Sequence, residues 1–234
     1  MTTPQIPDVL ATRYASAALV ELWSPRAKVA LERQLWIAVL KAQAELGIDV
    51  PAGVVDDYER VVANVDLDSI NAREKVTRHD VKARIEEFNA LAGHEHIHKG
   101  MTSRDLTENV EQLQIRESLV LIRDRMVAAL ARLARLAAEH AELVIVGRSH
   151  NVAAQATTLG KRFASAGDEL LIALERIEQL IARYPLRGIK GPMGTAQDML
   201  DLLDGDAAKL AQLEASVAGH LGFERVLNSV GQVY

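Results

Sequence analysis

The sequence predicts an all-α protein in which a small N-terminal helical domain is followed by the long helices of a bundle. Glycine and proline, which interrupt helices, supply only 14 and 6 of the 234 residues. Residues 103–140 contain neither, and apolar residues recur there at spacings of three and four. This stretch is far longer than the usual helix of a globular domain. The pattern favours long helices over a sheet-rich fold.

Shorter helices are expected in the first part of the chain. Apolar side chains fall near one face of residues 26–46, and Gly47 follows as a stop signal. Pro51 opens a second, shorter helix that fades by Asn64. We expect these helices to belong to a first domain, residues 1–101.

A third helix in this domain is predicted from a start signal. Thr77 is followed three residues later by Asp80, which has the form of a capping box. The helix that this box opens should run to about Ala92, just before Gly93.

Long helices dominate the rest of the chain, which we expect to form a second domain at residues 102–234. One should span residues 103–140, and a second apolar stripe covers residues 159–181 after a loop at residues 146–151. A weaker stripe runs over residues 196–221. Long helices with near-heptad stripes and short connections pack at shallow angles into a bundle.

Composition excludes several classes of function. A net charge of −5 and a pI near 5.8 argue against a protein that binds duplex nucleic acid. There is no cysteine, which excludes disulfides and thiolate chemistry. No run of about 18 apolar residues predicts a membrane span, and the N-terminus has no secretory signal pattern. We expect a cytoplasmic protein without membrane or nucleic-acid partners.

Polar residues gather at two predicted helix starts. Arg78 and His79 lie in the first turn after Thr77, where backbone N–H groups and the helix dipole favour anions. Thr102 and Ser103 open the longest helix, and their hydroxyls and free N–H groups could hold a carboxylate. Ordinary helix caps with solvated charges explain either segment equally well on local grounds.

A third polar segment is the loop that contains His150. Imidazole is the side chain best suited to proton transfer near neutral pH, although a single loop histidine is more often structural. The glycine-rich residues 188–195 lack the spacing of a phosphate-binding loop. Gly160 and Lys161 also fail that pattern, because Gln155 occupies the place of its first glycine. These mismatches exclude a P-loop nucleotide hydrolase.

Residues 94–98 fit the zinc-protease pattern H-E-x-x-H, but the surrounding sequence argues against a metal site. That chemistry needs both histidines on one face of a stable helix and a third ligand further along. Gly93 and Gly100 bracket the segment, and no following ligand pattern appears. We expect no metal and no cofactor.

Six segments, taken in order, resemble the adenylosuccinate lyase branch of the fumarase and aspartase superfamily. Each segment is weakly specific alone, but together they extend across nearly the whole chain. They are Arg13-Tyr14, TRHDV at residues 77–81, HKGMTSRDLTEN at residues 98–109, GRSHNVAAQATTLGKRF at residues 147–163, GPMGT at residues 191–195 and SVGQVY at the end.

The resemblance implies a reaction and a role for each matching residue. The reaction is the elimination of fumarate from a succinyl-purine nucleotide, either succinyl-AMP or succinyl-AICAR, in purine biosynthesis. His150 would be the general acid that protonates the departing nitrogen, and His79 and His98 would be further catalytic histidines of the active site. The substrate-binding residues implied by the motifs are Arg13 and Tyr14 for the phosphate, Arg78, His79 and Asp80 for the substrate, Thr102 and Ser103 for a succinyl carboxylate, and Gln232.

The chain also departs from the family pattern. Ser149 stands where threonine is common, and Asn151-Val152 replaces a more usual Gly-Gln or Gly-Val. The family's signature loop SSxMPxKxNP, which carries the serine base, is absent from this sequence. The resemblance therefore implies a truncated chain, inactive or nearly so alone, whose full-length parent forms a homotetramer. Another fumarate-releasing lyase, such as argininosuccinate lyase, and a non-catalytic helical assembly module remain alternatives.

Overall fold

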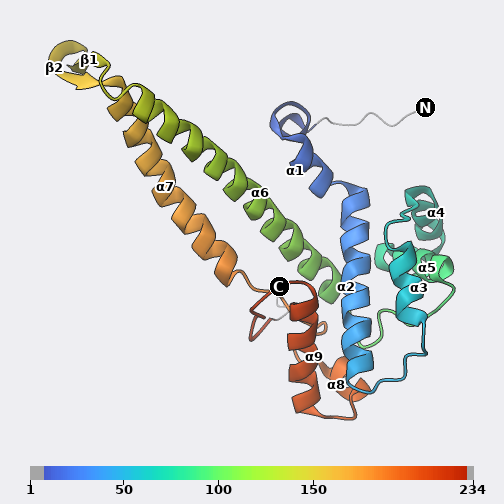
Figure 1. Ribbon diagram of the computed structural model, residues 1–234. Coiled ribbons are helices and arrows are strands. Elements are labelled where there is room, and N and C mark those ends of the chain that lie inside the picture. Colours follow the sequence, from blue (N-terminus) through green and yellow to red (C-terminus); the bar gives the residue numbers. More distant parts are fainter. Residues whose placement is uncertain (1–7, 231–234) are drawn as a thin grey trace, which may run out of the picture. The chain divides into compact units, whose positions relative to one another are not determined.

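The computed structural model describes residues 8–230 and is mostly helical (Figure 1). The chain divides into two compact units, residues 1–117 with 184–234, and residues 118–183. We call them unit 1 and unit 2. The division falls within one long helix, so it differs from the predicted domains 1–101 and 102–234, whose boundary stays a prediction.

Unit 1 is organised around helix α2, Pro25–Glu45 (Figure 1). The Ser24 hydroxyl accepts the Ala27 N–H at 3.1 Å, and Pro25 fits the first turn because its missing N–H would have no partner there. The helix ends before Gly47, which has a positive φ of 89°. This helix was predicted to within one residue at each end.

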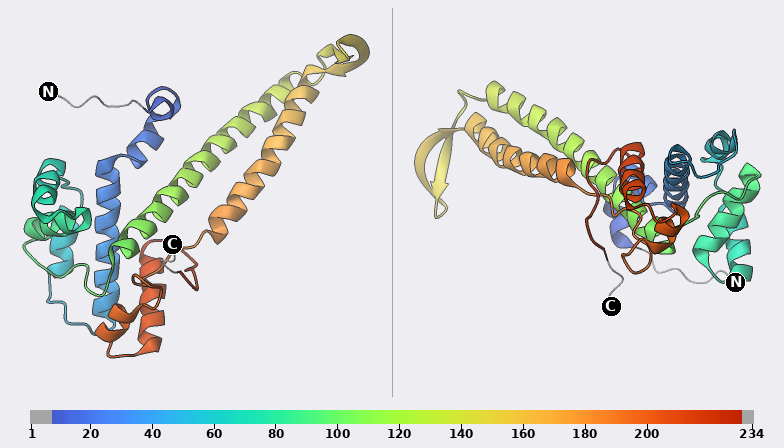
Figure 2. Two further views of the ribbon diagram at one scale, coloured as in Figure 1. Left: turned by 180° about the vertical axis from the view of Figure 1, so that it is seen from behind. Right: turned by 90° about the horizontal axis from the view of Figure 1, so that it is seen from below.

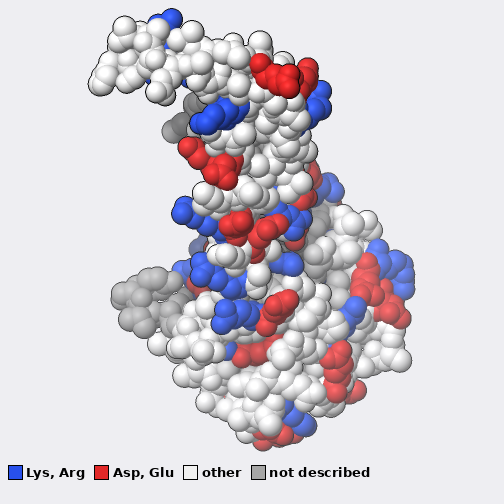
Figure 3. Space-filling model, turned by 60° about the vertical axis from the view of Figure 1, so that its left-hand side comes forward, with Lys and Arg blue, Asp and Glu red and all other residues white. Residues whose placement is uncertain are grey.

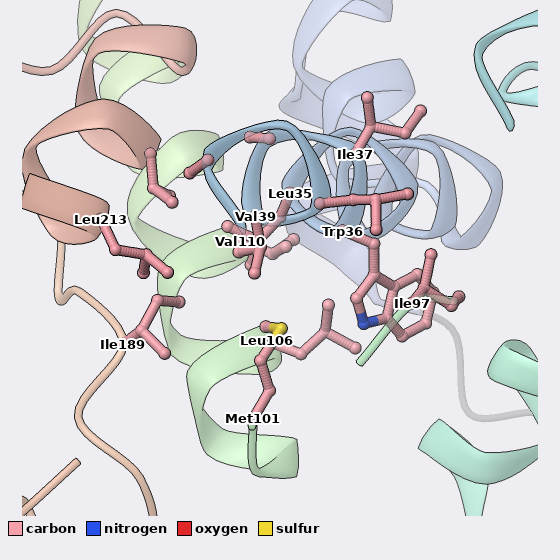
Figure 4. Packing of buried hydrophobic residues seen from close by; sticks show 14 of the residues in the cluster. Leu35, Trp36, Ile37, Val39, Ile97, Met101, Leu106, Val110, Ile189 and Leu213 are labelled. Atoms are coloured by element: carbon pink, nitrogen blue, oxygen red, sulfur yellow. The ribbon is translucent and has the colours of Figure 1, made fainter. Parts of the chain in front are cut away.

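The principal core of unit 1 forms where α2 meets other helices. In Figure 4, Trp36 and Val39 of α2 face Leu106, Val110 and Met101, all near the start of α6. Helix α6 covers Ser103–Glu139, close to the predicted residues 103–140. Burial of such side chains removes apolar surface from water, which stabilises the fold by roughly 25 cal/mol for each Å² buried.

Three further helices lie beside α2: α3, Val54–Val61; α4, Leu67–Thr77; and α5, Asp80–Ala92. The sequence predicted α3 and α5 but not α4, in which Ile70 is the one buried residue. Asp66 caps α4 by accepting the Ser69 N–H at 3.0 Å. A short π-helix, η1, Leu10–Tyr14, and α1, Ala17–Leu22, precede α2.

The last helices of unit 1 correct one prediction. The weak stripe at residues 196–221 is two helices, α8, Gln197–Leu202, and α9, Ala207–His220. Asp204 and Gly205 both have positive φ between them, so the helix cannot continue there. Asp206 then caps α9 by accepting the N–H groups of Ala208 and Lys209.

Unit 2 contains the rest of α6, helix α7, Leu159–Arg183, and a β-hairpin (Figure 2). Predicted residues 159–181 agree with α7. Gly160 lets the two helices approach, since a Cβ there would lie 2.4 Å from the carbonyl oxygen of Ala137. Leu174 is the one apolar side chain of α7 that is buried.

The hairpin replaces the loop that was predicted at residues 146–151. Strands β1, Val144–Ser149, and β2, Val152–Thr158, pair antiparallel, with an irregularity between Gly147 and Arg148. His150 and Asn151 form the two-residue turn, with positive φ values of 47° and 61°. Two successive positive φ values characterise the turn type that best matches the twist of a hairpin.

Among residues 8–230, no helix is both long enough and apolar enough to cross a membrane.

Candidate functional site

The turn between α4 and α5 carries the first cluster of predicted site residues. Arg78 ends α4 in the left-handed conformation, φ 53°, and is exposed. His79, not Thr77, is the N-cap of α5, because its Nδ1 accepts the Lys82 N–H at 3.3 Å. The predicted capping box is therefore wrong by two residues. The Thr77 hydroxyl instead closes a local turn by donating to the His79 carbonyl at 3.0 Å.

Asp80, the third polar residue of this turn, is held by an arginine. Arg84 forms ion pairs with Asp80 and, at 2.5 Å, with Glu32 of α2. Glu32 is buried, and burial raises its pKa to about 7 against the opposing effect of Arg84. This network anchors the turn to α2, and Glu32 and Arg84 are residues that sequence reasoning missed.

His98 lies close to this turn in unit 1. Its Nδ1 accepts the indole N–H of Trp36 at 2.9 Å, and the two rings meet edge to face. Burial, together with the positive charge of nearby His79, lowers the pKa of His98 to about 4. The structure thus brings His79 near enough to act electrostatically on His98, although they are 19 positions apart in the sequence.

The start of α6, four residues beyond His98, carries Thr102 and Ser103. Both residues are partly buried. The sequence analysis expected free N–H groups here, but the Thr102 N–H donates to the Asp105 carboxylate at 2.9 Å. The anion-binding capacity of this helix start therefore depends on the hydroxyls and the later N–H groups.

Asp105 is the centre of a buried network that the sequence did not reveal. Its carboxylate pairs with Arg187 and accepts the N–H groups of Lys190 and Gly191 at 2.9 and 3.0 Å. Arg187 also pairs with Glu108 at 2.5 Å. The network joins the start of α6 to the glycine-rich residues 188–195, which gives that segment a structural role.

The remaining residues predicted for unit 1 are not joined to this cluster. Arg13 and Tyr14 lie in η1 and are exposed, and no hydrogen bond or ion pair within residues 8–230 links their side chains to His79 or His98. Tyr14 instead lines a groove with Leu10, Leu19 and Trp23. Gln232 lies outside the described residues.

His150 belongs to unit 2, where it stands exposed at the tip of the hairpin. Arg148 donates to the Asn151 carbonyl at 3.0 Å and so braces the turn. Both hairpin faces are largely exposed, including Val144, Val146 and Val152. Arg148 is the one Asp, Glu, Lys or Arg residue in positions 143–158, and Figure 3 shows few charges at this end.

The zinc-protease pattern at residues 94–98 has no helix to support it. Residues 94–96 have no regular secondary structure and residues 97–100 form a turn, in keeping with the flanking glycines. His94 pairs with Asp57 at 2.7 Å, while His98 contacts Trp36. No cluster of three potential metal ligands occurs within residues 8–230.

Comparison with known proteins agrees with the sequence motifs. The family model described as "Lyase" matches residues 15–215. The chain is 34% identical over 229 residues to an adenylosuccinate lyase of Schistosoma mansoni, covering 96% of this chain and 48% of that protein. It is 35% identical over 240 residues to an adenylosuccinate lyase of Saccharomyces cerevisiae, covering 100% of this chain and 48% of that protein. The chain thus spans about half the length of these relatives.

Solved structures show the same fold at lower identity. A fumarate lyase from Mesorhizobium sp. BNC1 superposes with a TM-score of 0.78 at 23% identity, over 92% of this chain and 50% of that one. A 3-carboxy-cis,cis-muconate lactonizing enzyme from Pseudomonas putida gives the same TM-score at 20% identity, over 95% of this chain and 51% of that one. With the family model covering most of its length, the chain belongs to the lyase family, within the superfamily of fumarase and aspartase that its motifs predicted.

Proposed function

We propose that this chain forms part of an adenylosuccinate lyase, a carbon–nitrogen lyase that eliminates fumarate from succinyl-AMP and from succinyl-AICAR in the cytoplasm. The main support for this proposal is that the chain is 34–35% identical in sequence to two adenylosuccinate lyases over nearly its whole length. No cofactor is needed, because the reaction moves protons and breaks a carbon–nitrogen bond without a change of oxidation state overall.

His150 is the proposed general acid. Elimination removes a proton from the carbon beside a carboxylate, forms the carbon–carbon double bond of fumarate and expels the purine nitrogen, which takes a proton from the imidazolium of His150. Exposure at a hairpin tip supports this role, since the ring can exchange its proton with water and reach a substrate. We assign the base to no residue of this chain.

His79 and His98 are proposed to contact the substrate in unit 1. His79 caps the start of α5 beside Arg78, and its charge acts on His98 in the turn before α6, so these residues supply donors and positive charge for an anionic group. The start of α6 is proposed to bind a succinyl carboxylate through Thr102 and Ser103. For Arg13, Tyr14, Asp80 and Gln232, the roles implied by the motifs remain proposals.

A second copy of the chain is proposed to complete the site. The hairpin, whose one charged residue is Arg148, has no partner layer within unit 2, and exposed Val146 and Val152 would gain from being covered. We propose a homo-oligomer, a tetramer in the complete protein, in which another subunit covers the hairpin and contributes to the site around His150.

The experiment compares His150→Gln with His220→Gln in the complete protein that contains this sequence. Cleavage of succinyl-AMP is followed by ultraviolet absorbance. We expect His150→Gln to lower kcat by about 10²- to 10⁴-fold, the usual value of a positioned acid. His220, which pairs with Glu45 on the surface, serves as the matched histidine control and should retain full activity.

Two results would contradict the proposal. An unchanged kcat in His150→Gln would remove the acid assignment. Faster cleavage of argininosuccinate than of succinyl-AMP would remove the purine assignment and leave only the superfamily chemistry.

A further inference from the structure

Trp36 is a buried residue of α2 that none of the motifs singles out, and its single polar atom meets a site histidine. The indole is 1% exposed and packs beside Ile97 (Figure 4) and Phe88. Its Nε1 lies 2.9 Å from Nδ1 of His98, which is a normal hydrogen-bond distance.

The chemistry of this contact fixes the tautomer of His98. An indole N–H can only donate, so the Nδ1 that it faces must present a lone pair. A neutral imidazole carries one proton, which in His98 must therefore lie on Nε2. Protonation of Nδ1 would set two N–H groups against each other and leave the Trp36 donor buried without an acceptor.

Other features of the local structure hold the ring in place and keep it neutral. His98 has a positive φ of 68°, which is uncommon for a residue with a side chain, and Gln43 donates to the next carbonyl, that of Lys99, at 2.9 Å. Of the titratable groups that the structure describes, His79 is the one whose charge acts on His98, and it opposes a second positive charge. Burial lowers the pKa of His98 in the same direction.

We propose that Trp36 is a positioning residue that locks His98 as a neutral imidazole with its proton on Nε2, so that His98 binds an anionic oxygen of the substrate as a fixed hydrogen-bond donor. The part of the proposal that concerns substrate rests on the proposed lyase function. In that reaction His98 does not transfer a proton, and this separates its role from that of His150.

Ring ¹⁵N spectroscopy of the protein labelled at histidine tests the tautomer directly. The His98 signals are assigned by their loss in His98→Gln. We expect Nδ1 to show the shift of a bare nitrogen and Nε2 that of a protonated one, without titration above about pH 5. A proton on Nδ1, or titration near pH 6.5, would overturn the proposal whatever reaction the protein catalyses.

Trp36→Phe tests the role of the indole, because it keeps an aromatic ring and removes the N–H. We expect His98 in this variant to titrate at least about one pH unit higher than in the wild type. Tyr58→Phe is the matched control. It removes another buried donor next to Phe88, one that bonds Asn89 at 2.6 Å, and should leave the His98 signals unchanged.

The outcomes of this comparison are distinct. An unchanged His98 titration in Trp36→Phe would refute the positioning role, and the same shift in Tyr58→Phe would assign the effect to general loosening of the core. If Trp36→Phe does not fold, the wild-type spectrum alone decides between the two tautomers.

An activity measurement in the complete protein separates a fixed donor from a proton carrier. A glutamine at position 98 can place an amide N–H near the position of Nε2 but cannot carry a proton. We therefore expect His98→Gln to keep kcat/KM within about tenfold and His98→Leu to lose at least about a hundredfold. Equal losses of about 10²- to 10⁴-fold in both variants would show proton transfer instead. If the wild type cleaves no succinyl-purine, the proposed function fails while the spectra still decide the role of Trp36.

Discussion

Substitution of Asp105 by asparagine should be one of the most destabilising conservative changes in unit 1. The carboxylate is fully buried and pairs with Arg187. It also accepts backbone N–H groups from Thr102, Lys190 and Gly191 at 2.9–3.0 Å. Asparagine has nearly the same shape, but it loses the charge and turns an NH₂ group toward these donors. One change therefore leaves both a buried cation and a backbone donor poorly satisfied.

The magnitude follows from the partners that remain. Removing one member of a buried ion pair costs about 3–5 kcal/mol. Arg187 keeps a second ion pair with Glu108 at 2.5 Å, so the lower end of that range, about 3 kcal/mol, is expected. Loss of the Thr102 contact should also loosen the α6 start and raise KM for an anionic substrate in the complete protein.

The assay is equilibrium unfolding in urea, followed by circular dichroism, with the slope of the transition compared between variants. Asp66→Asn is the matched control, because Asp66 caps the Ser69 N–H on the surface, where asparagine caps equally well. We expect a change below about 0.5 kcal/mol in the control. A loss of less than about 1 kcal/mol in Asp105→Asn would refute the reasoning that this network stabilises unit 1.

Three other predictions concern stability. Gly160→Ala should destabilise unit 2, because its Cβ would lie 2.4 Å from the Ala137 carbonyl oxygen. Gly167→Ala in the same helix is the control: its Cβ meets no atom closer than 3.8 Å, so it should stabilise unit 2 by about 0.5–1 kcal/mol. Thermal unfolding followed by circular dichroism compares the two variants. The pKa of His98 is lowered from 6.5 to about 4, so as the pH falls the unfolded chain binds a proton at His98 before the folded chain does. The free energy of unfolding should therefore fall by about 3 kcal/mol between pH 6.5 and pH 4. Urea unfolding of His98→Gln should lack this loss. The pKa of Glu32 is raised from 4.5 to about 7, so between these pH values the folded chain keeps a proton that the unfolded chain has lost. The wild type should therefore lose stability as the pH rises, and Glu32→Gln should gain about 3 kcal/mol relative to it between pH 4.5 and pH 7. A constant difference in the free energy of unfolding across that range would contradict the raised pKa.

The sequence predicted those helices whose pattern is long and uninterrupted. Residues 103–140 lack glycine and proline, and α6 follows them almost residue for residue. Helix α4 was missed because Ile70 is its single buried residue, so no apolar stripe marks it. The hairpin was missed because its strands are short, although the β-branched residues 144–146 were a usable signal.

The site was predictable only as separate segments. The motifs supplied His79 and His98, but their proximity depends on the packing of α5 against the turn before α6, which no local pattern encodes. The sequence could not identify Trp36 and Asp105 as site residues either, because their partners are also brought to them by long-range packing. An indole at a helical spacing indicates core, and an acid in a first turn indicates an ordinary cap; only the fold shows that one meets His98 and the other Arg187.

The two kinds of histidine in this chain suit two different tasks in an elimination. A general acid must lose a proton and regain it in every turnover, so contact with water favours it, and His150 stands exposed on a hairpin tip. A donor that orients an anion works best when its proton and ring cannot move, which partial burial and the hydrogen bond from Trp36 provide for His98. Exchanging these environments would impair both tasks, because a buried acid would recover its proton slowly and an exposed donor would protonate and rotate. If the proposed chemistry holds, mutations that bury the hairpin tip within one subunit should lower kcat, whereas loss of the Trp36 contact should act mainly on KM.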